Sequence, residues 1–208
     1  MNSSKYAYWF FENALTEKFC DDVIKYANEK KEKPALTGNK MDISELNQKE
    51  LKDLKLKRDS NIVWLGEKWI YNEIQPYIND ANYYAGWNYQ WDWSEECQFT
   101  KYKSNQFYNW HRDSFDKPFP ETRGPDYNGK IRKLSVSCLL SDENEYEGGN
   151  LEFQTRDQDD PNIVVTTEKI KKKGTIIVFP SYTWHRVTPV TKGTRYSLVI
   201  WNLGNPFV

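Results

Sequence analysis

Apolar side chains recur with a helical period in two segments near the N-terminus. In residues 16–30 they are spaced to share one face, and Thr16 followed by Glu17 suits the start of a helix. The same period over residues 67–84 predicts a second helix, which Pro76 should kink. The apolar positions that define the two faces are Phe19, Val23, Ile24, Tyr26, Ala27, Trp69, Ile70, Ile74, Tyr77 and Ile78.

The charged stretch between these helices lacks such a period. Residues 31–60 are expected to form a variable loop that holds a short helix at 44–52, and residues 61–65 are expected to form a short strand. After Trp87 the chain changes to short runs rich in β-branched and aromatic residues, separated by turn formers. We expect strands at 88–93, 97–102, 107–113, 131–140, 149–153, 162–165, 175–180, 184–189 and 194–202.

This pattern predicts the fold class. Many short strands are typical of a sandwich or barrel, and helices gathered before them are expected to pack on one outer face of the sheets. The class is therefore α+β, mainly β. A chain of 208 residues suits a single domain, with 1–86 as a helical support region and 87–208 as the β core that carries the site.

Charge and cysteine content narrow the function classes. With 29 basic and 30 acidic residues, the net charge of −1 provides no field that would attract nucleic acid or a membrane. Cys20, Cys97 and Cys138 are far apart, which favours neither a disulfide framework nor a thiolate zinc site. No secretory leader or membrane span is apparent. We expect a cytoplasmic protein, or one of the host cytoplasm if the chain is viral.

The chain has only two histidines, and both lie in predicted strands. His111 and Asp113 are two residues apart, so on an extended strand their side chains leave the same face. His185 would complete a set of two histidines and one carboxylate if its strand lies beside theirs. Such a triad is typical of non-haem Fe(II). Each piece alone is more often structural: a His-x-Asp pair arises by chance, and a histidine among aromatic residues is commonly half-buried.

A basic residue follows His185 at a suggestive position. Residues 194–201 are expected to return antiparallel to 184–189, with Arg195 about 13 Å along the ladder from His185. A five-carbon diacid bound to the metal at one end would reach a guanidinium at that distance, and arginine binds carboxylates with paired hydrogen bonds. The alternative is a strand arginine whose charge reaches out to solvent.

Together these residues resemble a known family. The His-x-Asp pair at 111–113, His185 after a strand ending in Phe179-Pro180, and the segment Gly-Thr-Arg-Tyr-Ser-Leu-Val-Ile-Trp around Arg195 look like the Fe(II)- and 2-oxoglutarate-dependent oxygenases. The resemblance is to their prolyl 4-hydroxylase-like branch, including small microbial or phage-type members, and spans about residues 97–203. It implies a double-stranded β-helix (jelly-roll) core and His111, Asp113 and His185 as iron ligands.

The resemblance also implies cofactor-binding residues. Arg195 matches the partner of the distal carboxylate of 2-oxoglutarate, and Tyr102 matches a tyrosine that adds a phenol hydrogen bond. Trp201 matches an aromatic wall of the pocket, and Tyr108 an aromatic residue near the metal. Many members carry a tyrosine where this chain has Leu139, so cosubstrate anchoring is expected to rest more on Arg195 and Tyr102.

The implied activity is hydroxylation of a substrate carbon coupled to decarboxylation of 2-oxoglutarate to succinate. The partners would be dioxygen and a peptide or protein containing a prolyl residue, with a small-molecule substrate left open; ascorbate would keep the iron reduced. The alternative is a non-catalytic jelly-roll binding or structural module with a vestigial metal site. A zinc hydrolase is disfavoured because no His-Glu-x-x-His motif is present. Residues 114–130 are expected to be either a lid over the substrate or a surface excursion.

Overall fold

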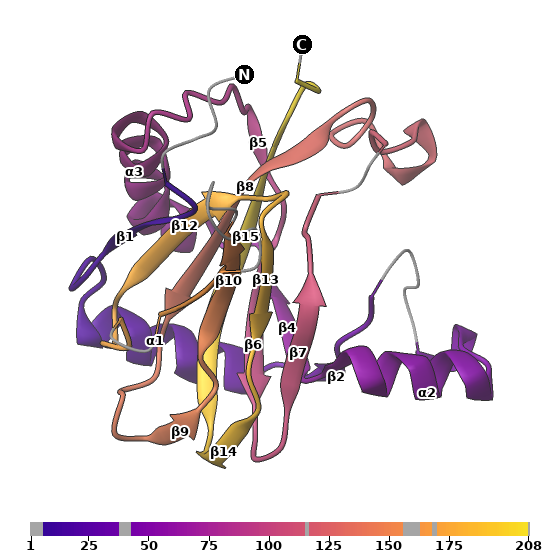
Figure 1. Ribbon diagram of the computed structural model, residues 1–208, viewed down its shortest axis with the longest axis vertical. Coiled ribbons are helices and arrows are strands. Elements are labelled where there is room, and N and C mark those ends of the chain that lie inside the picture. Colours follow the sequence, from indigo (N-terminus) through magenta and orange to yellow (C-terminus); the bar gives the residue numbers. More distant parts are fainter. Residues whose placement is uncertain (1–5, 38–42, 115–116, 156–162, 168–169, 208) are drawn as a thin grey trace.

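The computed structural model describes residues 6–37, 43–114, 117–155, 163–167 and 170–207 (Figure 1). Its helices are α1 (Glu17–Asn28), α2 (Gln48–Lys57) and α3 (Lys68–Tyr84), with short 3-10 helices at η1 (Ile43–Glu45) and η2 (Glu121–Arg123). Among the described residues, none of these helices has both the length and the apolar character needed to cross a bilayer.

The helix starts follow local chemistry. The Thr16 side chain accepts a hydrogen bond from the Phe19 N–H at 3.1 Å, which confirms the expected start of α1. Asn47 and Glu50 form a reciprocal capping box, and this places the start of α2 four residues later than predicted. Pro76 lies inside α3.

Eight antiparallel strands form the larger sheet. Its order is β1-β12-β8-β15-β6-β4-β2, with β5 paired to β15. These strands are β1 (Trp9–Phe11), β2 (Lys33–Pro34), β4 (Asn61–Leu65), β5 (Trp93–Ser94), β6 (Cys97–Tyr102), β8 (Ile131–Leu139), β12 (Ile176–Pro180) and β15 (Arg195–Gly204).

Two smaller sheets complete the β structure. A five-stranded antiparallel sheet has the order β11-β10-β13-β7-β3, and β14 pairs with β9. Their strands are β3 (Arg58–Asp59), β7 (Phe107–His111), β9 (Tyr146–Gly148), β10 (Leu151–Thr155), β11 (Ile163–Thr166), β13 (Trp184–Val187) and β14 (Val190–Gly193).

The larger sheet has a different core on each face. On its outer face, buried residues of α1 and α3 such as Val23 and Ile74 pack against strand residues such as Val178 and Leu198. Figure 1 shows α1 and α3 beside this sheet and α2 reaching away from the strands. Between the larger and the five-stranded sheet lies a second cluster that includes Phe153 and Phe179. The helices therefore support the sheet from outside and leave its inner face for chemistry.

Three strand predictions are wrong in instructive ways. Residues 88–92 are not a strand, and only Trp93 of the predicted range belongs to one, β5. The Asn82 side chain bonds both backbone polar groups of Tyr89, and Asn88 has φ of 52°. The strand predicted at 107–113 ends at His111. Beyond it, the N–H groups of Asp113 and Ser114 both donate to the Ser181 carbonyl at 2.9 Å.

The third error concerns the predicted return strand. β13 and β15 do not pair; β13 lies between β10 and β7, whereas β15 lies between β8 and β6 in the other sheet. The intervening strand β14 pairs with β9 and carries the chain across. Arg195 therefore faces His185 from the opposite sheet, not along a shared ladder.

Burial of α3 against the larger sheet should dominate the stability of the N-terminal half. We expect Ile74→Ala to lower the free energy of unfolding by about 2–5 kcal/mol, because the fully buried side chain leaves a cavity. Urea unfolding followed by circular dichroism measures this loss. The exposed neighbour Glu73→Ala is the control, and equal losses in the two variants would contradict the packing described.

Candidate metal centre and its pocket

The two histidines meet because their strands pair. β7 and β13 are antiparallel neighbours with His111 directly opposite His185, and the two ring centroids are 4.1 Å apart. Asp113 follows the end of β7, where its backbone N–H is fixed to Ser181. Both imidazoles and the carboxylate are buried, with 5–7% exposure. The prediction that these residues converge is confirmed, although Asp113 does not lie on the strand.

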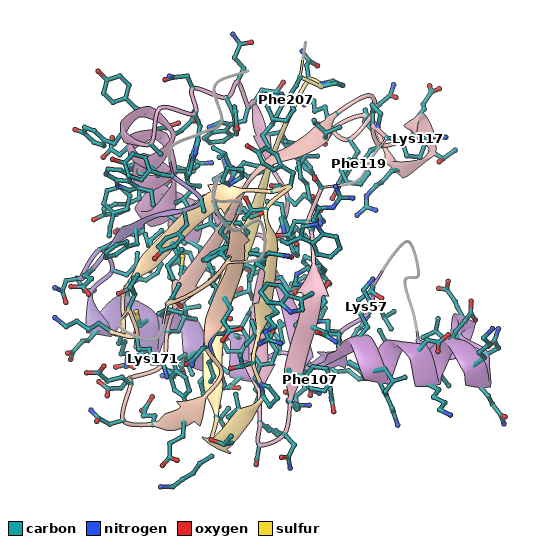
Figure 2. All side chains as sticks on the ribbon, in the orientation of Figure 1. Lys57, Phe107, Lys117, Phe119, Lys171 and Phe207 are labelled. Carbon is teal, nitrogen blue, oxygen red and sulfur yellow. The ribbon has the colours of Figure 1, made fainter. Side chains whose placement is uncertain are left out.

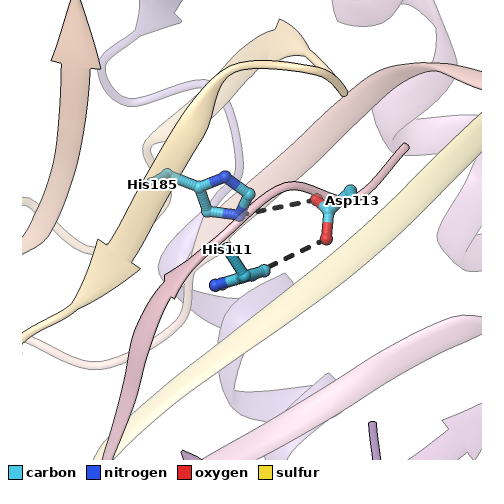
Figure 3. A group of neighbouring side chains, drawn as sticks. All are labelled: His111, Asp113 and His185. Carbon is cyan, nitrogen blue, oxygen red and sulfur yellow. Dashed lines mark ion pairs between the residues drawn. The ribbon is translucent and has the colours of Figure 1, made fainter. Parts of the chain in front are cut away.

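The ligand atoms of these three residues face one another (Figure 3). The Nε2 atom of His111 lies 3.7 Å from Oδ1 of Asp113, and Nε2 of His185 lies 3.5 Å from Oδ2. One ligand atom from each residue can be chosen so that all lie within 4.8 Å of one another. A single metal ion at their centre would be within coordinating reach of all three side chains.

Hydrogen bonds set the tautomer of both rings. The Nδ1 atom of His111 lies 2.8 Å from the Asn109 carbonyl oxygen, and Nδ1 of His185 lies 2.9 Å from the Thr183 carbonyl oxygen. A carbonyl only accepts, so each Nδ1 carries a proton, and Nε2 is the ring nitrogen that faces Asp113. Metal-bound histidines are commonly oriented in this way, by a backbone carbonyl behind the ring.

The carboxylate is held and kept ionised. The Ser135 hydroxyl donates to Oδ2 of Asp113 at 2.8 Å, and Ser135 also hydrogen-bonds the Ser181 hydroxyl. Burial alone would raise the pKa of Asp113, but the two imidazoles, Arg132 and Ser135 outweigh it and lower the pKa below its ordinary value. Burial also holds the pKa of His111 well below its ordinary value, with His185 adding to the effect. Both groups are therefore in their metal-binding protonation states at neutral pH.

A cavity opens beside the three ligands, between the two large sheets. Its empty volume is about 440 Å³, including open solvent at its mouth. One wall is the inner face of β15, where Arg195, Ser197, Val199 and Trp201 alternate toward the cavity as the sequence predicted. The rest of the lining is Arg58, Gln98, Thr100, Tyr102, Tyr108, His111, Asp113, Val136, Ser137, Leu151, Phe179, His185 and Val187.

Arg195 is a buried cation without a counter-ion. Its side chain is 2% exposed, Nη1 donates to the Ser197 hydroxyl at 3.0 Å, and its guanidinium lies 5.6 Å from the centre of the Tyr102 ring. Its buried Nε–H has no hydrogen-bond partner, and no described carboxylate forms an ion pair with it. Because burying an uncompensated charge is costly, this geometry suits an anionic ligand in the cavity.

Glycines at the end of β9 allow Arg195 to pack here. Gly149 has φ of +59°, and a Cβ atom there would lie 2.9 Å from Cδ of Arg195. At Gly148, with φ of +72°, a Cβ atom would lie 2.3 Å from the Pro189 carbonyl oxygen. The Gly148-Gly149 pair is therefore required by backbone conformation and by the close approach of the arginine.

Aromatic residues flank the metal site as the resemblance implied. The Tyr108 ring stacks on His111 with centroids 3.5 Å apart, and burial raises the pKa of its phenol to about 12. Trp201 is 6% exposed and lines the cavity, and its buried indole N–H lacks an acceptor. Leu139 lies in the apolar cluster between the sheets, so it supplies packing and no polar contact.

Arg58 is the main site residue that the sequence did not reveal. It is 5% exposed and lines the cavity, although the sequence suggested a variable loop there. Its Nε donates to Ser60 at 2.9 Å, and its Nη2 donates to Gln98 at 2.7 Å. No local sequence pattern predicts a buried arginine at this position, because β3 is two residues long and is held in place by its pairing with β7.

An ion pair between Arg132 and Glu95 lies next to the cavity. Arg132 makes two hydrogen bonds to the buried Glu95, one of them 2.8 Å long, and its guanidinium lies 3.9 Å from the Trp201 ring centre. The described part of segment 114–130 is anchored here, because Arg123 approaches Glu95 at 3.8 Å and Phe119 is 6% exposed (Figure 2). The segment is tied to the site, whereas its role as a lid stays a prediction; residues 115–116 lie outside the described residues.

Comparison with known proteins gives a family match. The profile of the 2OG-Fe(II) oxygenase superfamily matches residues 97–202. A PKHD-type hydroxylase of Synechococcus sp. (strain CC9605) is 41% identical over 98 residues, which are 47% of this chain and 37% of that protein. One from Alteromonas mediterranea is 34% identical over 105 residues, or 50% of this chain and 41% of that protein. The matched part of the chain thus spans only about two fifths of these relatives.

Solved structures resemble the whole described fold. A viral collagen prolyl hydroxylase from Paramecium Bursaria Chlorella virus-1, in its 2OG complex, has a TM-score of 0.64 at 19% identity and covers 96% of this chain and 97% of its own. A Pseudomonas putida prolyl-4-hydroxylase has a TM-score of 0.63 at 17% identity, with coverage of 95% and 92%. A Trichoplax adhaerens prolyl hydroxylase, in complex with a hypoxia inducible factor peptide fragment, has a TM-score of 0.62 at 16% identity, with coverage of 95% and 84%.

The hydrogen bond from Ser135 should strengthen metal binding by orienting Asp113. We expect Ser135→Ala to weaken binding of Co(II), a spectroscopic stand-in for the native ion, by about 10- to 100-fold. Titration of the visible cobalt bands measures the affinity. Ser137→Ala, two residues along β8 and without a hydrogen bond to a metal-site residue, is the control. An unchanged affinity in Ser135→Ala would show that Asp113 is oriented without this contact.

Proposed function

The chain belongs to the 2OG-Fe(II) oxygenase superfamily, and we propose that it is a 2-oxoglutarate-dependent hydroxylase whose ferrous ion is held by His111, Asp113 and His185. The observation that carries this proposal is the position of the three ligand atoms beside a buried, unpaired guanidinium in one cavity. A structural ion would require the ligands but would not require Arg195.

The donor set fits the metal that the family implies. Two neutral imidazoles and one carboxylate, all reaching in from one side, leave coordination positions open toward the cavity. When bound, iron and 2-oxoglutarate supply the oxidation: dioxygen is consumed, 2-oxoglutarate becomes succinate and carbon dioxide, and a substrate carbon gains a hydroxyl group. The protein contributes the orientation of the ligands and a pocket that limits water.

Arg195 would bind the distal carboxylate of 2-oxoglutarate. Its Nε–H and its Nη groups form the rigid fork that matches a carboxylate, and Ser197 holds one Nη in place. Tyr102 lies beside Arg195 on the paired strand β6 and would add its phenol hydroxyl. The apolar side chains of Phe179, Val187 and Val199 would exclude water from the bound cosubstrate.

The arrangement of the strands supports a jelly-roll interpretation. The eight-stranded and five-stranded sheets contribute opposite walls of one cavity. The chain passes from β12 in the first sheet to β13 in the second and, after β14, returns to the first sheet in β15. This alternation is what a double-stranded β-helix requires. In that fold, the single domain would consist of the β core from residue 87 onward and an N-terminal region that supplies the support helices and adds strands β1 to β4 to the two sheets.

The substrate that we propose is a prolyl residue in a peptide or protein. The support is the set of structural neighbours, which are prolyl hydroxylases, one of them in complex with a peptide fragment. Ascorbate as the reductant that maintains ferrous iron belongs to the same proposal.

Metal and cosubstrate binding test this function without knowledge of the substrate. In the absence of oxygen, Fe(II) and 2-oxoglutarate should together produce a weak visible charge-transfer band. His111→Ala should abolish the band because a ligand is lost. Arg195→Ala should shift its 2-oxoglutarate titration to about 10- to 100-fold higher concentration, the loss of a charged hydrogen-bonded contact.

Lys192→Ala is the matched control for Arg195. Its ammonium lies on the surface in an ion pair with Glu147, so the titration should not move. Absence of any band in the wild-type protein, with iron bound, would refute the proposed function. Succinate formation in air provides an independent measurement of turnover.

A further inference from the structure

Asp113 lies outside the strands, unlike the two histidines of the metal site. β7 ends at His111 and β8 begins at Ile131, and the described residues between them contain a 3-10 helix and no strand. A carboxylate at the start of such a segment moves with it unless its own backbone is held. The N–H of Asp113 donates to the Ser181 carbonyl at 2.9 Å, which holds one of its two backbone polar groups.

Arg132 holds the other backbone polar group of Asp113. Its Nη1 donates to the Asp113 carbonyl oxygen at 3.4 Å, a long hydrogen bond between the two ends of segment 114–130. Nε and Nη2 of the same guanidinium donate to the Glu95 carboxylate, the second at 2.8 Å. The side chains of Arg132 and Glu95 are 11% and 3% exposed. Each guanidinium nitrogen therefore has an acceptor, and the arginine closes the base of the segment.

The flat face of the same guanidinium supports a wall of the cavity. Its central carbon lies 3.9 Å from the centre of the Trp201 ring, and Trp201 lines the cavity that holds the metal ligands. Glu95 also reaches Trp201 directly, because its backbone N–H donates to the Trp201 carbonyl at 2.9 Å. One buried ion pair therefore contacts both a proposed metal ligand and the cavity wall.

Segment 114–130 is tied to the same carboxylate. Nη2 of Arg123 lies 3.8 Å from Oε2 of Glu95, and the Arg123 guanidinium lies 4.7 Å from the ring centres of Phe119 and Tyr127. Both rings pack in the apolar cluster that contains Trp201. The Arg123 side chain is 32% exposed and its contact with Glu95 is longer, so it is the weaker of the two arginine partners.

We propose that Arg132 is a positioning residue that holds Asp113 in the orientation required for metal binding, and that Glu95 fixes this arginine. The inference rests on the metal site of the proposed function. A buried ion pair adds little stability compared with apolar packing of similar volume, so stability does not account for the pair. Geometry does, because a guanidinium can bind a carboxylate through two nitrogens and donate to a carbonyl through the third.

Charge and position make opposite predictions for this arginine. A positive charge beside a metal site repels the metal ion, so its removal would strengthen metal binding if charge alone mattered. Loss of a contact that orients a metal ligand weakens binding by about 10- to 100-fold. We therefore expect Arg132→Gln to weaken Co(II) binding at neutral pH by this factor. Arg132→Lys keeps the charge but loses the planar fork, so it should also bind Co(II) more weakly than the wild type.

The Co(II) protein provides two readouts that do not need turnover. Titration measures the affinity, and the visible bands at saturation report the coordination geometry, which a contact that serves only stability would leave unchanged. We expect altered bands in Arg132→Gln and Arg132→Lys. Lys130→Gln is the matched control: it breaks a 2.7 Å ion pair with Asp92 that joins the same two parts of the chain. No described contact joins Lys130 to Asp113, so both readouts should stay at wild-type values.

A double variant tests whether Glu95 acts through Arg132. Glu95→Gln should weaken Co(II) binding because it loosens the arginine. The double variant of Glu95→Gln and Arg132→Gln should bind no more weakly than Arg132→Gln alone, as expected for two residues that act as one unit. Additive losses, or a double variant that returns to wild-type affinity because the two charges cancel, would overturn the inference. Thermal melting verifies that each variant is folded.

The outcomes separate this inference from the proposed function. If the wild-type protein binds no Co(II), the metal site of the proposed function itself fails. If it binds Co(II) and folded Arg132→Gln binds it equally or more tightly, the inference is wrong and the proposed function stands. If Arg132→Gln does not fold, Arg132→Lys and Glu95→Gln decide. Wild-type affinity and unchanged bands in both of these would overturn the inference.

Discussion

The pairing of β7 with β13 is the constraint on which the rest of the site depends. It places His111 opposite His185, and the backbone carbonyls two residues before each histidine fix both imidazole protons on Nδ1. Shifting this register by one residue would turn one histidine to the other face of the sheet. The Ser181 carbonyl, which accepts from Asp113 N–H, then brings the carboxylate to the buried Nε2 atoms of the two histidines.

The architecture separates stability from chemistry. Apolar packing of α1 and α3 is confined to the outer face of the larger sheet, and polar residues such as Thr100, Ser137 and Arg195 occupy its inner face. A sheet supported on one side can carry polar and charged groups on the other, because the helices supply the burial that stabilises the strands. Buried charges are tolerated when each has a partner, and the Nε–H of Arg195 has none among the described residues.

The sequence was sufficient to predict site residues of a rare type and site residues on a strand with regular alternation. Only two histidines are present, so the candidate metal ligands were few, and strict alternation along β15 placed Arg195 and Trp201 on one face. Residues that are placed by contacts between distant parts of the sequence could not be predicted. Arg58 reaches the site through a two-residue strand, and Glu95 meets Arg132 37 positions later. The error at residues 88–93 has the same origin, since the side chain of Asn82 decides that backbone.

A crystal structure of the anaerobic protein with Fe(II), recorded at the iron absorption edge, tests the central claim most directly. We expect one anomalous peak about 2.1 Å from Nε2 of His111, Nε2 of His185 and an oxygen of Asp113, with neighbouring positions facing the cavity. A peak coordinated through Nδ1, or one that contacts only one of the two histidines, would contradict it.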